Sequence, residues 1–381
     1  MKYYLIAGEA SGDLHGSKLM QALYAQDPGA DIRFWGGDLM DAVYGEHQEG
    51  IGLVEDYREG AVMGLFSVLL QGRQILKRLE RCKQDIRSWQ PDVVILIDYP
   101  GFNLPVAEFA HNAGFKVFYY IAPKVWASRE GRIEKLKAWV DKLFIVFPFE
   151  KEYFSRHQLP YVYAGNPLVD AIQSSPALQE SRDSFLSRTS LPDRPWIALL
   201  PGSRSMEIKS MMPVFMKFAD AWHRTHPSDL FVIAAAPARS RKDYNIGRRD
   251  YVKVIFDETY GILRHARAAV VNSGTASLEA ALIGTPQVVG YKMSIVPAWL
   301  AHKYVKVKYV SLGNLILDRL AFREFLMEEL NSKALLEEVS RLTEDTAYRQ
   351  RMLADYAEIR SLLGGSGASE KVARAMVDAL S

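Results

Sequence analysis

An acidic residue stands where the catalytic groups of α/β enzymes collect. The run 93–97 is fully apolar, and Asp98 follows it directly. Partial burial at the end of such a strand would raise the pKa of the carboxyl group, which makes it a better proton acceptor near neutral pH. The plainer alternative is a carboxylate that caps the turn before Pro100. We favour a catalytic role for Asp98.

A glycine-rich loop, residues 8–16, follows the first apolar run and opens a helix. Glycines let the backbone approach a ligand closely, and a helix N-terminus offers unpaired N–H groups to an anion. The loop lacks the glycine spacing of a dinucleotide fingerprint, which argues against a nicotinamide cofactor. A tight turn capped by Ser11 or Asp13 would explain the glycines equally well. Glu9 is a second candidate carboxylate, because it would face the same end of the sheet.

A loop in the second half of the chain suits a phosphate. Gly202, Ser203 and Arg204 follow another apolar run and precede a helix. Small residues expose backbone donors, and an arginine can bind a phosphate through two parallel hydrogen bonds. A purely structural turn would not need an arginine at this place.

A second loop in that half also opens a helix. Its candidate ligand-binding residues are Ser273, Gly274, Thr275, Ala276, Ser277 and Glu279. Hydroxyl groups and the first N–H groups of a helix suit a pyrophosphate, and Glu279 would accept hydrogen bonds from ribose hydroxyls. An acid that merely stabilises the helix N-terminus is the alternative for Glu279. Together the two loops predict a nucleotide diphosphate site.

Two sheets are needed to position these loops. Apolar runs of strand length alternate with helical patterns at 2–7, 32–35, 93–97, 116–121, 143–147 and 161–164, and again at 196–200, 230–236, 252–255, 268–271 and 287–290. Continuous apolar strands indicate burial on both faces, as in a parallel sheet covered by helices. We predict an α/β fold with two Rossmann-like, doubly wound domains, 1–170 and 171–354, and a ligand cleft between them. A C-terminal helical segment, about 355–381 and broken at 364–367, would pack on the first domain.

Composition limits the class of protein. A chain of 381 residues is too long for one ordinary core, and its net charge of +2 creates no field that attracts nucleic acid. The single Cys82 excludes an intramolecular disulfide, and we expect an incidental surface or half-buried thiol. No histidine pair has metal-ligand spacing, so we expect no metal. No signal peptide or run of about 18 apolar residues is present, which predicts a cytoplasmic protein that meets membranes only peripherally.

The order and spacing of these loops resemble those of the lipid-A-disaccharide synthases, bacterial glycosyltransferases of family 19 with the GT-B fold. Matching segments lie at 8–16, 63–64, 98–103, 123–126, 201–204, 273–276, 311–315 and 363–369, over nearly the whole chain. The chain departs from the usual family residues at Lys124, Ser128, Asn166, Gly313 and Arg323. These departures leave acyl-chain preference open.

The resemblance implies an inverting transfer, without metal or cofactor, of diacylglucosamine from UDP to the 6-hydroxyl of diacylglucosamine 1-phosphate. The products would be a β-1,6 disaccharide 1-phosphate and UDP, within lipopolysaccharide biosynthesis. Asp98 would be the general base, with Glu9 as the alternative base or as a partner that orients the acceptor. Arg204 and the helix at 275–279 would stabilise the leaving UDP, and Asn314 would help to bind the donor.

The acceptor and the membrane suggest further residues. Arg129 or Arg132 would bind the acceptor phosphate, and the other acceptor-side candidates are Ser11, His15, Asn103 and Trp126. Because both substrates carry acyl chains, an apolar run before a basic stretch would contact the inner membrane of a Gram-negative-type bacterium. The residues of that run are Val62, Met63, Leu65, Phe66 and Leu69. An ordinary core helix is the alternative.

The resemblance also implies that C-terminal helices can be exchanged within a homodimer, and the glycines at 364–367 would permit this. Two rival functions share the expected loops. One is another UDP-sugar transferase or a UDP-sugar epimerase, and the other is a binding protein that closes on a nucleotide sugar without chemistry. An epimerase needs no acceptor, and a binding protein would show no turnover.

Overall fold

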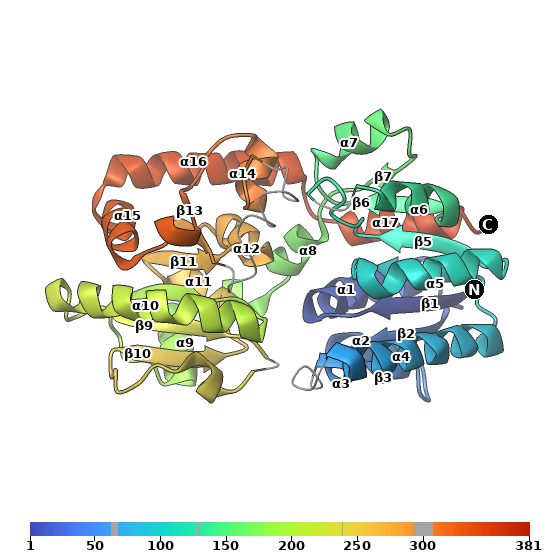
Figure 1. Ribbon diagram of the computed structural model, residues 1–381, viewed down its shortest axis with the longest axis horizontal. Coiled ribbons are helices and arrows are strands. Elements are labelled where there is room, and N and C mark those ends of the chain that lie inside the picture. The colour runs from blue at the N-terminus through green and yellow to red at the C-terminus, as the bar shows by residue number, and fades with distance from the viewer. Residues whose placement is uncertain (62–67, 128–129, 238, 293–307) are drawn as a thin grey trace. The chain divides into compact units, whose positions relative to one another are not determined.

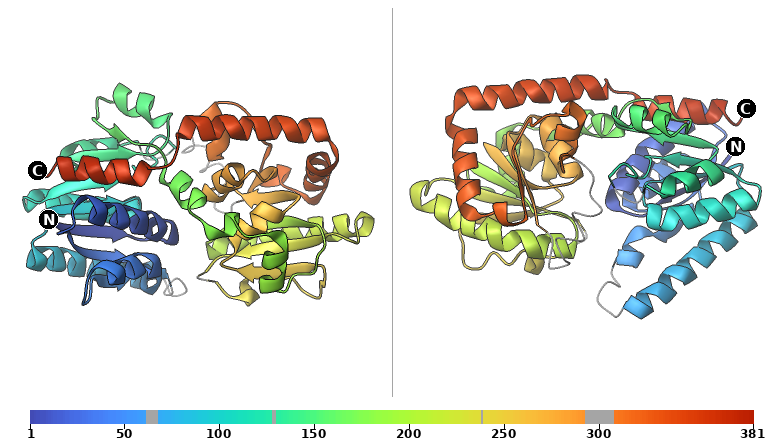
Figure 2. Two further views of the ribbon diagram at one scale, coloured as in Figure 1. Left: turned by 180° about the vertical axis from the view of Figure 1, so that it is seen from behind. Right: turned by 45° about the horizontal axis from the view of Figure 1, so that its top comes forward.

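A computed structural model describes residues 1–61, 68–127, 130–237, 239–292 and 308–381 (Figure 1). The chain forms two compact units, Met1–Ala171 with Gly365–Ser381, and Ile172–Gly364. Each unit contains one parallel sheet with helices on both faces (Figures 1 and 2). This confirms the predicted fold class of two doubly wound α/β units.

The sheet of the first unit has the order β3-β2-β1-β4-β5-β6-β7, and every pair of neighbours is parallel. Its strands are β1 (Lys2–Ala7), β2 (Asp31–Gly36), β3 (Leu53–Asp56), β4 (Val93–Ile97), β5 (Lys116–Tyr120), β6 (Lys142–Ile145) and β7 (Val162–Tyr163). β1 and β4 lie at the centre, with Ile6 beside Leu96. The two apolar runs expected for β1 and β4 have the predicted bounds.

Helices form two layers around this sheet. They are α1 (Ala10–Gln26), α2 (Asp38–His47), α3 (Tyr57–Ala61), α4 (Val68–Trp89), α5 (Pro100–Asn112), α6 (Arg132–Trp139), α7 (Glu150–Arg156), α8 (Pro167–Gln173) and α17 (Ala368–Asp378). α1 packs with α2 and α17, whereas α5 packs with α4 and α6. α8 contains the boundary between the units.

The segment expected at 355–381 is two helices. Residues 355–363 belong to α16 (Thr346–Leu363) of the second unit, which ends at Gly364 with a φ of +86°. The chain then continues into α17, the red helix at the C-terminus in Figure 2, which belongs to the first unit. Val372 and Met376 of α17 are buried, and the helix packs on α1. The carboxylate of Asp170 accepts hydrogen bonds from two amides at the start of this last helix, those of residues 367 (2.7 Å) and 369 (2.9 Å).

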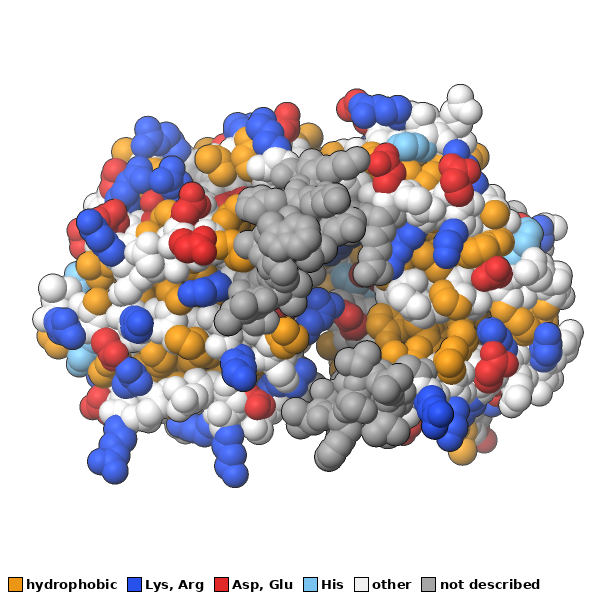
Figure 3. Space-filling model, viewed as in Figure 1, with side chains coloured by type: hydrophobic (Ala, Val, Ile, Leu, Met, Phe, Trp, Pro, Cys, Tyr) orange, Lys and Arg blue, Asp and Glu red, His pale blue; other side chains and the backbone are white. Residues whose placement is uncertain are grey.

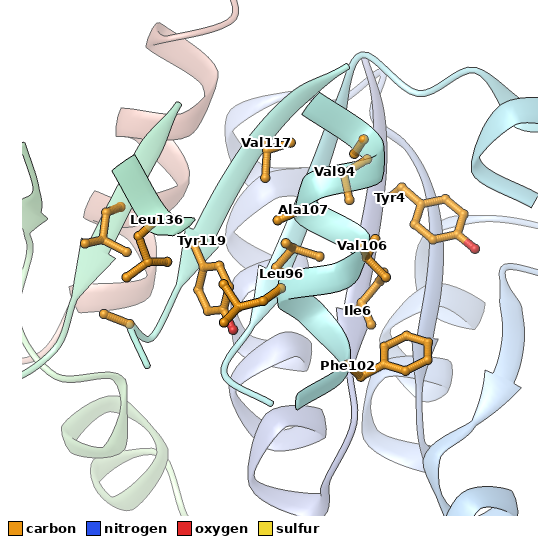
Figure 4. Close-up of a cluster of buried hydrophobic side chains, with 14 of the residues drawn as sticks. Tyr4, Ile6, Val94, Leu96, Phe102, Val106, Ala107, Val117, Tyr119 and Leu136 are labelled. Carbon is orange, nitrogen blue, oxygen red and sulfur yellow. The ribbon is translucent and has the colours of Figure 1, made fainter. Parts of the chain in front are cut away.

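The core of the first unit lies between β1, β4 and β5 and the helix α5 (Figure 4). Leu96, Phe102 and Tyr119 belong to this cluster, and each is at most 5% exposed. Cys82 of α4 is also fully buried in it, so the expectation of a surface or half-buried thiol was wrong. Burial raises the pKa of this thiol, which keeps it protonated at neutral pH.

The sheet of the second unit has the order β10-β9-β8-β11-β12-β13, again all parallel. Its strands are β8 (Trp196–Leu200), β9 (Leu230–Ala235), β10 (Val252–Phe256), β11 (Ala268–Asn272), β12 (Gln287–Tyr291) and β13 (Glu324–Leu326). Its helices are α9 (Arg182–Thr189), α10 (Ser205–Thr225), α11 (Thr259–His265), α12 (Thr275–Ile283), α14 (Leu312–Leu317), α15 (Ser332–Glu344) and α16. α10 packs with α15, and α11 packs with α12.

Candidate functional site

In each unit two of the predicted loops meet where the strand order reverses. β1 and β4 are neighbours, but the chain continues from β1 to β2 on one side and from β4 to β5 on the other. β8 and β11 have the same relation in the second unit. Doubly wound sheets bind ligands beyond the carboxyl ends of the strands at such points. The fold therefore places the four loops in two pairs, one pair in each unit.

In the first unit the two loops are in contact through Gly8 and Tyr99. A Cβ atom on Gly8 would lie 2.5 Å from Cγ and 2.6 Å from Cε1 of the Tyr99 ring. Real carbon contacts are about 3.5–4.0 Å, so only glycine fits at this position. The loop after β1 is thus fixed against the loop after β4.

Asp98 lies in a strained turn that is held from three sides. Both Asp98 (φ 43°) and Tyr99 (φ 46°) adopt the left-handed conformation, which is uncommon for residues other than glycine. The Asp98 amide donates to the carbonyl of Tyr120 (3.0 Å), and its own carbonyl accepts from the Tyr119 hydroxyl (2.6 Å). The side chain is half-buried. Strained backbone that is held in place by the surrounding structure is common at functional sites.

Asn103 provides the third support of this turn. It is completely buried, and its Nδ2 donates to the carbonyls of Asp98 (2.8 Å) and Ile97 (3.2 Å). From this buried position Asn103 holds the backbone of the Asp98 turn in place. The prediction that Asn103 contacts an acceptor does not fit this geometry.

Glu9 and Ser11 are exposed at the start of α1. Asp13 is buried, and its carboxylate accepts from the amides of Gly37 (2.8 Å), Leu39 (3.1 Å) and Met40 (3.1 Å). It therefore caps α2, so the alternative in which Asp13 caps its own helix was wrong. Burial raises the pKa of Asp13, and the three amides oppose that shift.

His15 faces the interior rather than the loop surface. It is 8% exposed, and its Nδ1 has no hydrogen-bond partner among the residues that the structure describes. Burial lowers the pKa of His15 to about 4, although the nearby charge of Asp170 raises it. A neutral, packed imidazole fits a structural role better than a direct contact with an acceptor.

Trp126 is held by an acidic residue that the sequence reasoning missed. Its Nε1 donates to Oε1 of Glu150 (3.0 Å), while Oε2 accepts from the amides of Val146 (3.0 Å) and Phe147 (2.9 Å). Glu150 is completely buried, and burial raises its pKa to about 7 against the effect of these hydrogen bonds. Trp126 itself remains half-buried at the carboxyl end of β5.

Arg132 begins α6 and is half-buried, whereas Arg129 lies outside the described residues. Burial raises the pKa of the Tyr119 hydroxyl well above its usual value, the charge of Asp98 raises it further, and the charge of Arg132 lowers it. The charges of Asp98 and Arg132 therefore both act on the Tyr119 hydroxyl, which donates a hydrogen bond to the Asp98 carbonyl. The structure brings Arg132 near the Asp98 turn.

Most of the predicted membrane residues lie outside the described part of the chain. These are Val62, Met63, Leu65 and Phe66, and the side chain of Leu69 is not described either. Further along α4, Ile75 (52% exposed) and Leu76 (61% exposed) lie beside the exposed Arg73 and Lys77. Within the described ranges we find no helix with the length and apolarity that a membrane crossing needs. On the face drawn in Figure 3, acidic and basic side chains are interspersed.

Two arginines lie at the loop after β8, Arg204 within it and Arg239 from the segment that follows β9. Gly202 (φ +107°) turns the chain beside the loop after β11, since a Cβ there would lie 2.9 Å from Nδ2 of Asn272. The Arg204 side chain is 66% exposed. Arg239, which the sequence reasoning missed, donates from Nε to the carbonyl of Ser203 (2.9 Å) and from Nη1 to the Ser205 hydroxyl (2.6 Å).

The loop after β11 opens α12, where the Ser277 amide donates to the carbonyl of Gly274 (3.2 Å) and the amides of residues 275 and 276 precede the first turn's hydrogen bonds. Thr275 and Ala276 are half-buried there. The Ser273 hydroxyl donates to the carbonyl of Val310 (2.8 Å). Ser277 is fully buried, and its hydroxyl donates to the carbonyl of Gly274 (2.8 Å). The prediction that Ser277 offers its hydroxyl to a pyrophosphate therefore does not fit.

Glu279 is half-buried one turn into α12. Burial raises its pKa to about 7, and a hydrogen bond with Tyr260 of α11 opposes that shift. Tyr260 was not identified from the sequence. In its ionised form this carboxyl group only accepts hydrogen bonds, which suits the recognition of hydroxyl groups.

Asn314 is completely buried and its amide is saturated. Nδ2 donates to the carbonyl of Phe322 (2.9 Å) and to Glu324 (2.8 Å), and Oδ1 accepts from the amides of Ala321 (2.8 Å) and Phe322 (3.3 Å). Glu324 also accepts from the amide of Ser311 (3.0 Å). Asn314 thus shapes the segment that binds Ser273, and the predicted direct contact with a donor does not fit.

Comparison with known proteins gives the family. The family model for lipid-A-disaccharide synthetase (LpxB) matches residues 3–376. The lipid-A-disaccharide synthase of Trichlorobacter lovleyi is 34% identical over 97% of this chain and 95% of its own length. That of Chromohalobacter salexigens is 36% identical over 99% of this chain and 96% of its own length.

Solved structures show the same fold at low identity. The UDP-GlcNAc 2-epimerase of Methanocaldococcus jannaschii, in complex with UDP-GlcNAc and UDP, matches with a TM-score of 0.68, 14% identity and coverage of 99% of this chain and 100% of that one. The spinosyn forosaminyltransferase SpnP matches with a TM-score of 0.61, 14% identity and coverage of 100% and 99%. The resemblance inferred from the loops is confirmed: the chain belongs to the lipid-A-disaccharide synthetase family and is a glycosyltransferase with the GT-B fold.

Proposed function

We propose that the protein joins UDP-2,3-diacylglucosamine to 2,3-diacylglucosamine 1-phosphate, with inversion and without a metal ion. A bond forms between the acceptor 6-oxygen and the donor anomeric carbon, and the bond from that carbon to UDP breaks. UDP leaves with the electron pair, and the hydroxyl proton passes to a carboxylate. The observation that carries this proposal is the strained Asp98 turn at the switch point of the first unit.

Asp98 is the proposed general base. A primary hydroxyl is a weak nucleophile, and a positioned base contributes about 10²–10⁴-fold to the rate. The backbone of Asp98 is fixed by Tyr119, Tyr120 and Asn103, which limits where its carboxylate can go. Glu9, exposed on the neighbouring loop, is the alternative base or a group that orients the acceptor.

UDP is proposed to bind to the loop pair of the second unit. Arg204 and the first amides of α12 would stabilise the negative charge that develops on the leaving diphosphate. Arg239 adds a second guanidinium to the same loop. Glu279 would accept from ribose hydroxyls. Because the base belongs to one unit and the diphosphate loops to the other, turnover requires both units.

On the acceptor side, Arg132 is the proposed partner of the 1-phosphate, with Trp126 against the sugar. The exposed Ile75 and Leu76, flanked by basic residues, support peripheral contact of α4 with an anionic membrane surface. We place the protein at the cytoplasmic face of a bacterial inner membrane. Exchange of α17 between two copies of the chain is a further prediction.

Incubation with both lipid substrates, followed by mass spectrometry, tests the proposal. We expect a disaccharide 1-phosphate and UDP, at a rate that a chelator of divalent ions does not change. The donor alone should stay intact. Conversion of the donor without an acceptor would identify an epimerase, and absence of disaccharide with both lipids present would contradict the proposed reaction.

A further inference from the structure

The loop after β8, which is the proposed phosphate loop, already binds a carboxylate of the protein itself. Glu207 lies in the first turn of α10, and its Oε2 accepts from the amides of Ser203 (3.1 Å) and Arg204 (3.2 Å). Its Oε1 lies 3.6 Å from Nη1 of Arg204. The two amides and the guanidinium that suit a phosphate oxygen therefore all face this carboxylate.

The loop is built around this carboxylate. Gly202 has a φ of +107°, and a Cβ atom there would overlap the carboxylate and lie 2.9 Å from Cβ of Glu207. The arrangement is a capping box, in which the third residue of a helix reaches back to the amides before it. The positive end of the 21-residue helix α10 further favours a negative charge here. Glu207 is thus a fixed charge rather than a chance surface contact.

We propose that Glu207 competes with the diphosphate of UDP for this loop and thereby weakens UDP binding, which speeds the release of this product. The inference rests on the proposed function, because it takes the loop after β8 as the diphosphate site. The diphosphate either displaces the carboxylate from the two amides or binds Arg204 with the carboxylate still in place. In both arrangements the negative charge of Glu207 opposes that of the ligand.

The size of the effect follows from the geometry. A phosphate bound to Arg204 would lie within about 7 Å of the Glu207 carboxylate, given the 3.6 Å between Arg204 and Glu207. At this separation, and at the dielectric of a largely exposed site, removal of one charge should change the affinity for a multiply charged diphosphate roughly tenfold. Salt reduces the difference, so the measurement belongs at low ionic strength.

Glu207→Gln isolates the charge. Glutamine keeps an oxygen that accepts from the loop amides, so the capping box and the loop shape should remain. Calorimetry should give a roughly tenfold lower dissociation constant for UDP in this variant. Uridine, which has no phosphate, should bind equally to both proteins. Stronger inhibition of turnover by added UDP should accompany the tighter binding.

Asp345→Asn is the matched control. Asp345 caps α16 of the same unit, where its Oδ1 accepts from the amide of Tyr348 (2.9 Å), and asparagine caps a helix equally well. This variant should bind UDP as the unmodified protein does.

Unchanged or weaker UDP binding in Glu207→Gln, with an unchanged melting temperature, would overturn the inference. A gain that extends equally to uridine would overturn it as well, because the effect would then not act on the diphosphate. Absence of UDP binding in both proteins is a different result, since it removes the proposed diphosphate site itself.

Discussion

Replacement of Gly8 by alanine should disturb the turn that carries Asp98. The added methyl group would lie 2.5 Å from Cγ of Tyr99, where an ordinary carbon contact needs about 3.5–4.0 Å. The ring must therefore move by about 1 Å or more. Because Tyr99 and Asp98 are adjacent and both left-handed, the ring cannot move far without the backbone of Asp98.

The cost follows from this overlap. Insertion of a methyl group into packed structure costs about 1–3 kcal/mol, which for a unit of this size corresponds to a fall in melting temperature of about 2–12 °C. A displacement of about 1 Å at a catalytic group lowers a rate by about 10²-fold. Affinity for UDP should not change, because the proposed diphosphate loops belong to the other unit.

Gly101→Ala is the control. Gly101 lies in the first turn of α5, close to the same turn, but a Cβ atom there would meet no atom within 4 Å. Alanine should stabilise this helix by about 0.5–1 kcal/mol. Melting curves and initial rates of disaccharide formation compare the two variants. If Gly8→Ala has the same melting temperature and rate as Gly101→Ala, the argument that Gly8 fixes the Asp98 turn is refuted.

Two other predictions concern carboxylates of the first unit, the buried Glu150 and the half-buried Asp170. The pKa of Glu150 is about 7 in the folded state and about 4.5 in the unfolded state, so its contribution to stability is full below pH 4.5 and falls by roughly 3 kcal/mol as the pH rises through 7. Urea unfolding at pH 5 and pH 7.5 should show most of this loss in the unmodified protein and not in Glu150→Gln; an identical loss in both would contradict the assignment. In Asp170→Asn, each charged hydrogen bond that is lost should destabilise α17 by about 1.5–3 kcal/mol. Amide hydrogen exchange of residues 368–378 should therefore be faster than in the unmodified protein. Exchange unchanged from that of the unmodified protein would show that Asp170 does not hold this helix.

The alternation of apolar runs predicted most of both sheets, because strands buried on two faces must be apolar throughout. The runs 2–7, 93–97 and 196–200 are strands with the same bounds. β3 and β13 were not predicted. Each has only three or four residues, largely half-buried and including acidic ones, so pairing with a neighbouring strand rather than composition defines them.

The site was harder to read from the sequence than the fold. Asn103, Ser277 and Asn314 stand in loops that suit a ligand, but the structure buries all three, and each donates a hydrogen bond to a backbone carbonyl. Whether a polar side chain binds backbone groups or faces a ligand depends on three-dimensional packing, which the sequence alone does not show.

The missed residues illustrate the same limit. Arg239 and Glu150 act on loops that are distant in sequence, because neighbouring strand ends bring them together. Neither residue has a distinctive local sequence. The partners of Arg239 and Glu150 can be named only once the strand order of each sheet is known.

The central claim is that a base in one unit acts on a donor whose diphosphate is held by the other. Asp98→Asn and Arg204→Ala, each assayed for UDP affinity and for disaccharide formation, test it most directly. We predict that Asp98→Asn binds UDP normally and forms product about 10²–10⁴-fold more slowly, whereas Arg204→Ala loses affinity for UDP. Full turnover in Asp98→Asn, or normal UDP affinity in Arg204→Ala, would contradict the claim.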